Sequence, residues 1–348
     1  MASGFNAQED IEVEGTLTGL DFVNPHAYVY FDTVGVDGGT LKMRCEMRAA
    51  TVLRRSGWSP EMFVAGVPIK ITGNPHHDDP ASCYAETLVL GDTALVRYQQ
   101  LTETTQTGSD NRPARLASGE LNISGDWAQE QYLVARGPNG GGLVPKSMVD
   151  GIVSGELSMA DVPSSGWGGA PVTYTDAGQA AADVVRAIPP SENLRARCEI
   201  TSVIFDWVFD GPINRITQRG DTIDFEYGRD LERTVYMGMD SHPANIEPGR
   251  AGHSIGIWDG DSLVVDTVGF EAGILGGSVA HTADLHVVER FTLDPETMTL
   301  RRDYAAEDPA YFTDQYAGTD FVKPADAPFA VDTCRELTYI DYSQTAEQ

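Results

Sequence analysis

Apolar and polar residues alternate with a period of two along most of this chain, which is the pattern of strands with one buried face. In the first hundred residues such runs cover 11–18, 27–32, 40–47, 67–73 and 86–90. Residues 49–56 are the one segment here with helical spacing, and Gly57 ends it. Five short strands and one small helix predict a compact barrel over residues 1–99, similar to the oligonucleotide/oligosaccharide-binding (OB) type.

A second series of strands follows two segments of different composition. Residues 100–122 are crowded with polar side chains and predict a linker, and residues 137–172 are rich in Gly, Pro and Ser and predict irregular structure. One short helix is expected over 177–186. From Cys198 onward, alternation predicts strands over 201–209, 213–217, 222–227, 232–237, 253–258, 262–268, 284–293, 297–304 and 335–341. We therefore expect an all-β chain in which residues 123–348 form a larger antiparallel barrel.

Charge sets this chain apart from an average protein. Its 348 residues include 52 Asp and Glu but only 24 Lys and Arg, a formal charge of −28. Such a field repels phosphate backbones and anionic lipid surfaces, so we expect no nucleic-acid partner. Solubility in a salty medium explains the acidity, and attraction of a cationic substrate or of Ca²⁺ is the alternative. No apolar run approaches the roughly 20 residues that cross a bilayer, so we expect no membrane insertion.

The four cysteines are widely spaced and include no CxxC pair, so neither a zinc site nor a thioredoxin-like motif is supported. Their even number suits two disulfides in an oxidising compartment. The pairings that keep to the two domains are Cys45–Cys83 and Cys198–Cys334. Four free, buried cysteines are the alternative.

Three of the seven histidines lie in two β-rich segments, 252–267 and 281–291. His253 begins a predicted strand, above apolar side chains on the same face. If residues 281–290 form one strand, Asp284, His286 and Arg290 share a face. On a face that lines a barrel, a carboxylate beside an imidazole raises its basicity, as general-base catalysis requires. A solvated outer face is the alternative, as is a His253 bound by backbone carbonyls of the long loop 238–252.

Other candidates complete a predicted site. Glu226 projects to the same side of its strand as Asp224. In a dry cavity the pKa values of two such carboxyl groups would separate, which would give one acid and one base. Tyr227, Trp258 and Phe270 would form an apolar cradle, with His286 and Arg290 as further binding residues. No nucleotide-binding, HExxH or GxSxG motif occurs, and the adjacent side chains of 76–79 diverge, so we expect no cofactor and no metal.

Several motifs resemble a large, uncharacterised family of exported bacterial proteins. In the first domain they are Asn24-Pro25-His26, Leu53-Arg54-Arg55-Ser56-Gly57-Trp58 and residues 66–73. In the second they are Cys198, Gly252-His253-Ser254-Ile255-Gly256, Trp258-Asp259-Gly260-Asp261, and the segment from His281 to Phe291. Family members often carry Gly-Arg after the aspartate near Asp240, where this chain has Ser241-His242. The resemblance, with the Gly-x-Trp form of residues 125–127, implies a lipocalin-like second domain.

The resemblance also bears on localisation. Residues 1–10 contain no apolar segment, so the chain is either cytoplasmic or has lost a signal peptide. Because the family is exported, we expect removal of a signal peptide and a periplasmic or secreted protein.

These observations lead to one leading hypothesis and two rivals. The leading hypothesis is cofactor-independent acid–base chemistry, of isomerase, cyclase or lyase (hydratase) type, on a small hydrophobic or aromatic metabolite inside the large barrel. His253 and His281 would be the acid and base, and Asp284 or Glu226 the orienting carboxylate. The rivals are a periplasmic carrier of a hydrophobic molecule without catalysis, and an accessory protein of envelope assembly. The oligomeric state stays open.

Overall fold

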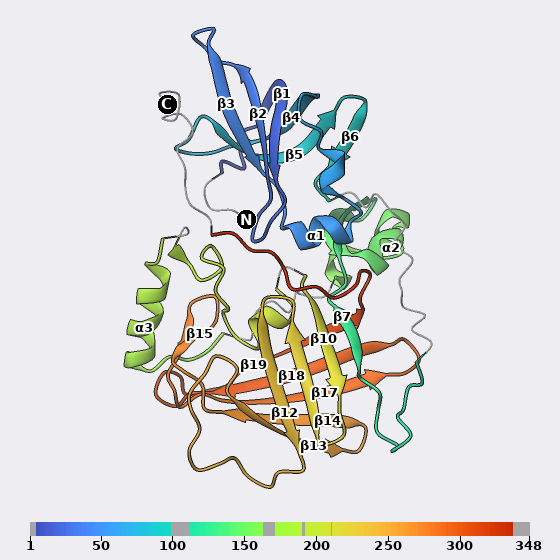
Figure 1. The fold of residues 1–348 in the computed structure, drawn as a ribbon, viewed down its shortest axis with the longest axis vertical. Helices are drawn as coiled ribbons and strands as arrows, with labels where there is room; N and C mark the ends of the chain where they lie inside the picture. The colour runs from blue at the N-terminus through green and yellow to red at the C-terminus, as the bar shows by residue number, and fades with distance from the viewer. Residues whose placement is uncertain (1–4, 99–111, 163–170, 190–191, 210, 337–348) are drawn as a thin grey trace.

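Two closed β-barrels, one after the other in the chain, make up most of the molecule (Figure 1). The computed structural model describes residues 5–98, 112–162, 171–189, 192–209 and 211–336. The predicted all-β class, with a small barrel followed by a larger one, is confirmed. Residues 100–111 of the predicted linker and most of the predicted strand 335–341 lie outside the described residues.

The first barrel contains the predicted five strands, which close in the order β1–β2–β3–β5–β4. The parallel β3–β5 pair completes the ring, and a short β6 adds to the edge of β5. Alternate side chains, among them Leu17, Phe31 and Ile71, fill the interior. The elements are β1 (Ile11–Asp21), β2 (Tyr28–Val34), β3 (Thr40–Glu46), α1 (Ala50–Arg55), η1 (Pro60–Met62), β4 (Pro68–Pro75), β5 (Ser82–Leu90) and β6 (Thr93–Val96).

After β7 (Gly125–Ala128), the first strand of the second barrel, the chain forms a small hairpin unit, so the expectation of irregular structure over 137–172 is wrong for its described first part. The elements are β8 (Tyr132–Gly137), β9 (Gly140–Pro145), η2 (Lys146–Met148), α2 (Val149–Ser154) and η3 (Met159–Asp161). Ala135, Val144 and Ile152 give this unit its own core. Its glycines permit close packing, because a Cβ on Gly137 would meet the carbonyl oxygen of Ile152. The predicted helix follows as α3 (Asp176–Arg186).

The second barrel closes in the order β7–β10–β11–β12–β13–β14–β17–β18–β19. Its strands pair antiparallel as expected, except that β12 and β13 run parallel because the loop 238–252 returns to the same end of the barrel. The strands are β7 (Gly125–Ala128), β10 (Ile213–Gln218), β11 (Thr222–Tyr227), β12 (Leu231–Met237), β13 (His253–Asp259), β14 (Ser262–Val268), β17 (His286–Asp294), β18 (Thr299–Glu307) and β19 (Tyr316–Pro324). A separate hairpin joins β15 (Gly273–Gly276) to β16 (Val279–His281).

Residues 201–209, predicted as a strand, instead form a plug inside the second barrel. Their only helical turn is η5 (Phe205–Trp207), and Trp207 has an exposed fraction of 0%. The Trp207 ring packs edge-on to Phe225, Tyr227 and Phe291 of the barrel wall, with centroids 5.8–6.0 Å apart. The alternating apolar residues of this segment therefore face a surrounding wall rather than a neighbouring strand. The plug occupies the position where we expected a ligand.

A buried ionic network holds this plug. Arg302 on β18 donates hydrogen bonds to the carbonyl oxygens of Val203 (3.1 Å) and Ile204 (2.8 Å). The same guanidinium bonds to Asp320 (2.6 Å) and Glu289 (3.2 Å). Arg233 pairs with the second oxygen of Glu289, so two cations face two carboxylates, and all four side chains are buried. Although burial alone would lower it, the pKa of Arg302 is raised because these carboxylates stabilise its charge.

Both predicted disulfides are present. Cys45–Cys83 crosslinks the parallel β3–β5 pair, and Cys198–Cys334 crosslinks the segment before the plug to the end of the described chain. Two disulfides are typical of proteins that fold in an oxidising environment outside the cytoplasm. Every helix that the structure describes is too short or too polar to cross a membrane.

Candidate functional site

Three neighbouring strands of the second barrel carry polar side chains on their outer face. Val265 on β14 and Val287 on β17 point into the core. Because side chains alternate across a strand, their neighbours Asp266 and His286 point outward. His253, the first residue of β13, likewise lies outside the core and is partly exposed.

The strand registers place His253 and His286 on either side of β14, each diagonal to Asp266. Asp266 pairs with Ile255 on β13 and with Val288 on β17. His253 and His286 are therefore each two residues from the position directly opposite the carboxylate. Diagonal neighbours on one face of a sheet lie within reach of long side chains. The carboxylate thus lies between two imidazoles.

The loop 238–252 brings a third imidazole to this face. His242 Nδ1 lies 2.8 Å from His253 Nδ1, and His242 Nε2 lies 2.9 Å from Oδ1 of Asp266. The other carboxylate oxygen lies 3.1 Å from Nε2 of His286. We refer to His242, His253, Asp266 and His286 as the histidine–aspartate cluster. All four are partly exposed, so solvent and small molecules reach the cluster.

With His242 taken as neutral, the hydrogen bonds assign the ring protons of the cluster. A carboxylate oxygen only accepts, so His242 donates from Nε2 to Asp266. Nδ1 of a neutral His242 is then an acceptor, and His253 donates to it from Nδ1. This leaves the lone pair of His253 on Nε2. Partial burial, and next the neighbouring His242, lower the pKa of His253, so this ring is neutral near pH 7.

Apolar side chains border the cluster on the outside of β12 and β13. The ring of Tyr236 stacks on His253, with centroids 5.2 Å apart and planes 15° from parallel. Tyr236 pairs with Ile255 across the parallel strands, and Ile257 lies two residues farther along the same face. Exposed fractions of 42% for Tyr236 and 55% for Ile257 are high for such side chains. An apolar ring placed here would lie beside the His253 imidazole.

Two predicted catalytic residues, His281 and Asp284, do not join this cluster. The strand predicted over 281–290 is interrupted: β16 ends at His281, and β17 starts only at His286. His281 is 6% exposed, donates from Nδ1 to the carbonyl oxygen of Thr282 (2.9 Å) and packs edge-on to Phe270. Burial lowers its pKa. Asp284 is exposed in the intervening turn, so the expected Asp284–His286 pair on one strand face does not form.

The expected apolar cradle is part of the packed core. Tyr227 and Phe270 are buried, and Trp258 packs partly against the same core. The Tyr227 hydroxyl donates to the carbonyl oxygen of Val203 in the plug (3.2 Å), and burial raises its pKa to about 12. These side chains surround the plug, not an open hollow.

Glu226 and Arg290 lie on the outer surface. Glu226 is partly exposed on β11, opposite Arg215 of β10. Arg290 donates from Nη2 to Asp259 (2.8 Å) across the outer face of the barrel. Of the predicted site residues, the structure brings His253 and His286 into the cluster, joined by His242 and Asp266.

Sequence reasoning missed His242 and Asp266. The hairpin register of β13 and β14 was a usable signal, because it places Asp266 on the face of His253. No comparable signal existed for His242, which comes from a loop. The Ser241-His242 departure from the family pattern marked the position without indicating its partner.

Among the described residues, no group of three or more His, Cys, Asp or Glu is arranged to hold a metal ion. In the cluster, four ring nitrogens and both Asp266 oxygens are instead engaged in hydrogen bonds to one another. The arrangement suits proton transfer along a chain of hydrogen bonds.

A family match found among known proteins covers most of the first barrel. Residues 1–84 match a family of unknown function (DUF6152). This agrees with an uncharacterised N-terminal domain and assigns no activity to it. No curated protein matches the chain.

Proposed function

We propose that this chain is a cofactor-independent acid–base catalyst that acts on a small hydrophobic or aromatic molecule at the histidine–aspartate cluster. The class is isomerase, cyclase or lyase, and the compartment is the periplasm or the exterior of the cell. The observation that carries the proposal is the hydrogen-bonded series Asp266–His242–His253, which ends on the partly exposed His253 imidazole.

Each residue has a role that follows from its contacts. His253 Nε2 is the base, because its Nδ1–H is engaged and its lowered pKa keeps the ring neutral. When His253 takes a proton, His242 and Asp266 stabilise the new charge, as a carboxylate does for an imidazolium. Tyr236 and Ile257 offer an apolar surface to the substrate. The site lies on the outside of the barrel, because the plug fills the interior.

The probe for this proposal is 5-nitrobenzisoxazole, a planar aromatic compound whose ring opens when a base removes one proton. The carbon–hydrogen and nitrogen–oxygen bonds break, a nitrile forms, and a coloured phenolate is released without any cofactor. General-base catalysis contributes about 10²–10⁴-fold. We therefore expect His253→Ala to lower the rate of ring opening about 100-fold, measured by absorbance at pH 7.5.

The matched control is His77→Ala, which removes an exposed imidazole from the first barrel. It is expected to keep the full rate. The rate of ring opening by Asp266→Asn is expected to lie between the rates of His253→Ala and His77→Ala. This variant keeps the base His253 but removes the carboxylate that stabilises its charge through His242. Ring opening at the same rate in wild type and His253→Ala would overturn the proposal. Binding of the probe at Tyr236 without turnover would favour the carrier hypothesis.

A further inference from the structure

The last described residues, 325–336, form an extended segment that runs between the two barrels, and we refer to it as the C-terminal strap (Figure 1). On the second barrel, the strap N–H groups of Ala325 and Phe329 donate to the backbone and side chain of Asp126. The Asp332 N–H donates to the carbonyl oxygen of Gly228 (2.8 Å). One side of the strap is thus fixed to the larger barrel.

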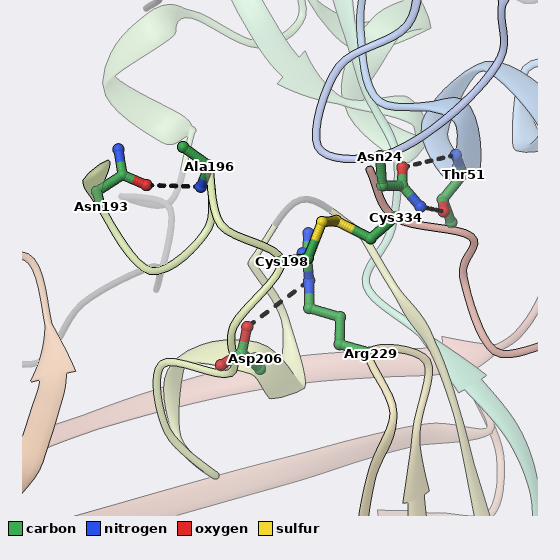
Figure 2. Close-up of a disulfide and its surroundings, with 8 residues drawn as sticks. All are labelled: Asn24, Thr51, Asn193, Ala196, Cys198, Asp206, Arg229 and Cys334. Carbon is green, nitrogen blue, oxygen red and sulfur yellow. Dashed lines mark hydrogen bonds and ion pairs between the residues drawn. A yellow bond between two sulfur atoms is a disulfide. The ribbon is translucent and has the colours of Figure 1, made fainter. Parts of the chain in front are cut away.

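The other side of the strap is bound to the first barrel. The Asn24 N–H donates to the carbonyl oxygen of Thr333 (3.0 Å), and the Arg335 N–H donates to that of Asn24 (2.9 Å). The Asn24 side chain is itself held by Thr51 of α1 (Figure 2). The strap therefore binds the first barrel at a residue whose side chain is held in place by α1.

Two ion pairs extend this contact along α1. Arg54 pairs with Asp332 (2.8 Å) and Arg55 with Asp326 (2.6 Å). Arg55 is 4% exposed and also donates to the carbonyl oxygens of Gly211 and Gln129. The Asn-Pro-His and Leu-Arg-Arg motifs of the first barrel thus supply its contacts to the strap.

The Cys198–Cys334 disulfide fixes the end of the strap beside its Asn24 contacts (Figure 2). Cys198 and Cys334 are both partly exposed, whereas Cys45 and Cys83 have an exposed fraction of 0%. Thiol–disulfide exchange needs access of a thiolate to one sulfur, so the two disulfides differ in their reactivity.

We propose that Cys198–Cys334 is a redox latch that couples the two barrels through the C-terminal strap. A thiolate of a dithiol reductant attacks one sulfur, which breaks the Cys198–Cys334 bond, forms a mixed disulfide and releases the other cysteine. The second thiol of the reductant then displaces the remaining cysteine as a thiol. Two electrons pass to Cys198–Cys334, and the reductant becomes a disulfide. Reduction frees the strap end and loosens it from Asn24, while the buried Cys45–Cys83 bond stays oxidised. The latch is independent of the histidine–aspartate cluster and its proposed chemistry.

The experiment titrates the native full-length chain with dithiothreitol and labels free thiols with iodoacetamide, followed by peptide mapping. We expect Cys198 and Cys334 to be labelled at a dithiothreitol concentration at least ten-fold lower than Cys45 and Cys83. Hydrogen exchange of the Asn24, Asp332 and Arg335 amides reports on the strap. Their exchange is expected to accelerate about ten-fold once Cys198–Cys334 is reduced.

Two variants keep the proposal testable. The double variant Cys198→Ser/Cys334→Ser is expected to show the faster exchange without reductant and no further response to it. Arg54→Gln weakens the ion pair with the strap but leaves the disulfide. Its strap amides are therefore expected to exchange faster, while Cys198 and Cys334 are labelled at the same dithiothreitol concentration as in wild type. Simultaneous reduction of both disulfides, or a strap that stays protected after selective reduction, would overturn the latch.

Discussion

Replacement of Arg302 by alanine is expected to lower the free energy of unfolding by about 3–5 kcal/mol, because it leaves buried carboxylates without their cation. Arg302 is 1% exposed and binds Asp320, Glu289 and two carbonyl oxygens of the plug. Guanidinium-induced unfolding followed by circular dichroism measures the change. Arg302→Met, which keeps most of the volume, is expected to lose a similar amount.

The adjacent Arg301 is the matched control, since it lies on the same strand and points outward. It pairs with Asp303 at the surface, where such pairs are worth about 0–1 kcal/mol. Arg301→Ala is therefore expected to unfold within about 1 kcal/mol of wild type. An Arg302→Met variant as stable as Arg301→Ala would contradict the role given to the ionic network.

Trp207→Ala is expected to lower the free energy of unfolding by about 3–5 kcal/mol, because a large buried ring is removed from a packed core. Guanidinium-induced unfolding measures this change as well. The three aromatic rings around Trp207 belong to β11 and β17, so the wall is unable to collapse fully onto the space. Phe321→Ala is the control, because Phe321 is 52% exposed on β19. We expect the control to lose less than about 1 kcal/mol.

A second measurement separates cavity formation from a general loss of structure. Engineered apolar cavities bind small aromatic molecules. Added indole is therefore expected to raise the melting temperature of Trp207→Ala and to leave that of wild type unchanged. A Trp207→Ala variant of wild-type stability would show that the plug does not fill the barrel.

Local patterns predicted the architecture well because strand alternation, turn residues and cysteine spacing are short-range signals. They predicted the five strands of the first barrel, the helix at 177–186 and both disulfides. The plug was missed because residues 201–209 alternate like a strand, and only the surrounding wall distinguishes the two structures. The parallel β12–β13 pair depends on the route of the loop 238–252, which no local pattern encodes.

The candidate site shows the same limit. The alternation around His286 already indicates which face of β17 is buried: Val287, Glu289 and Phe291 form the more apolar face and point inward. Their neighbours His286 and Arg290 therefore point outward, and the lone Glu289 among apolar residues marks the buried network. His242 reaches the site through tertiary folding alone. A sequence pattern predicts which face of a strand is buried, but not which loop covers the other face.

The central claim is that Asp266 and His242 hold His253 as a neutral base with its lone pair on Nε2. Nitrogen NMR of the histidine side chains across pH tests this directly, because protonated and unprotonated ring nitrogens differ in chemical shift. At pH 7.5 we expect His253 to carry its proton on Nδ1, and to titrate below its ordinary pKa of 6.5. A proton on Nε2 at pH 7.5, or a titration above 6.5, would contradict the account.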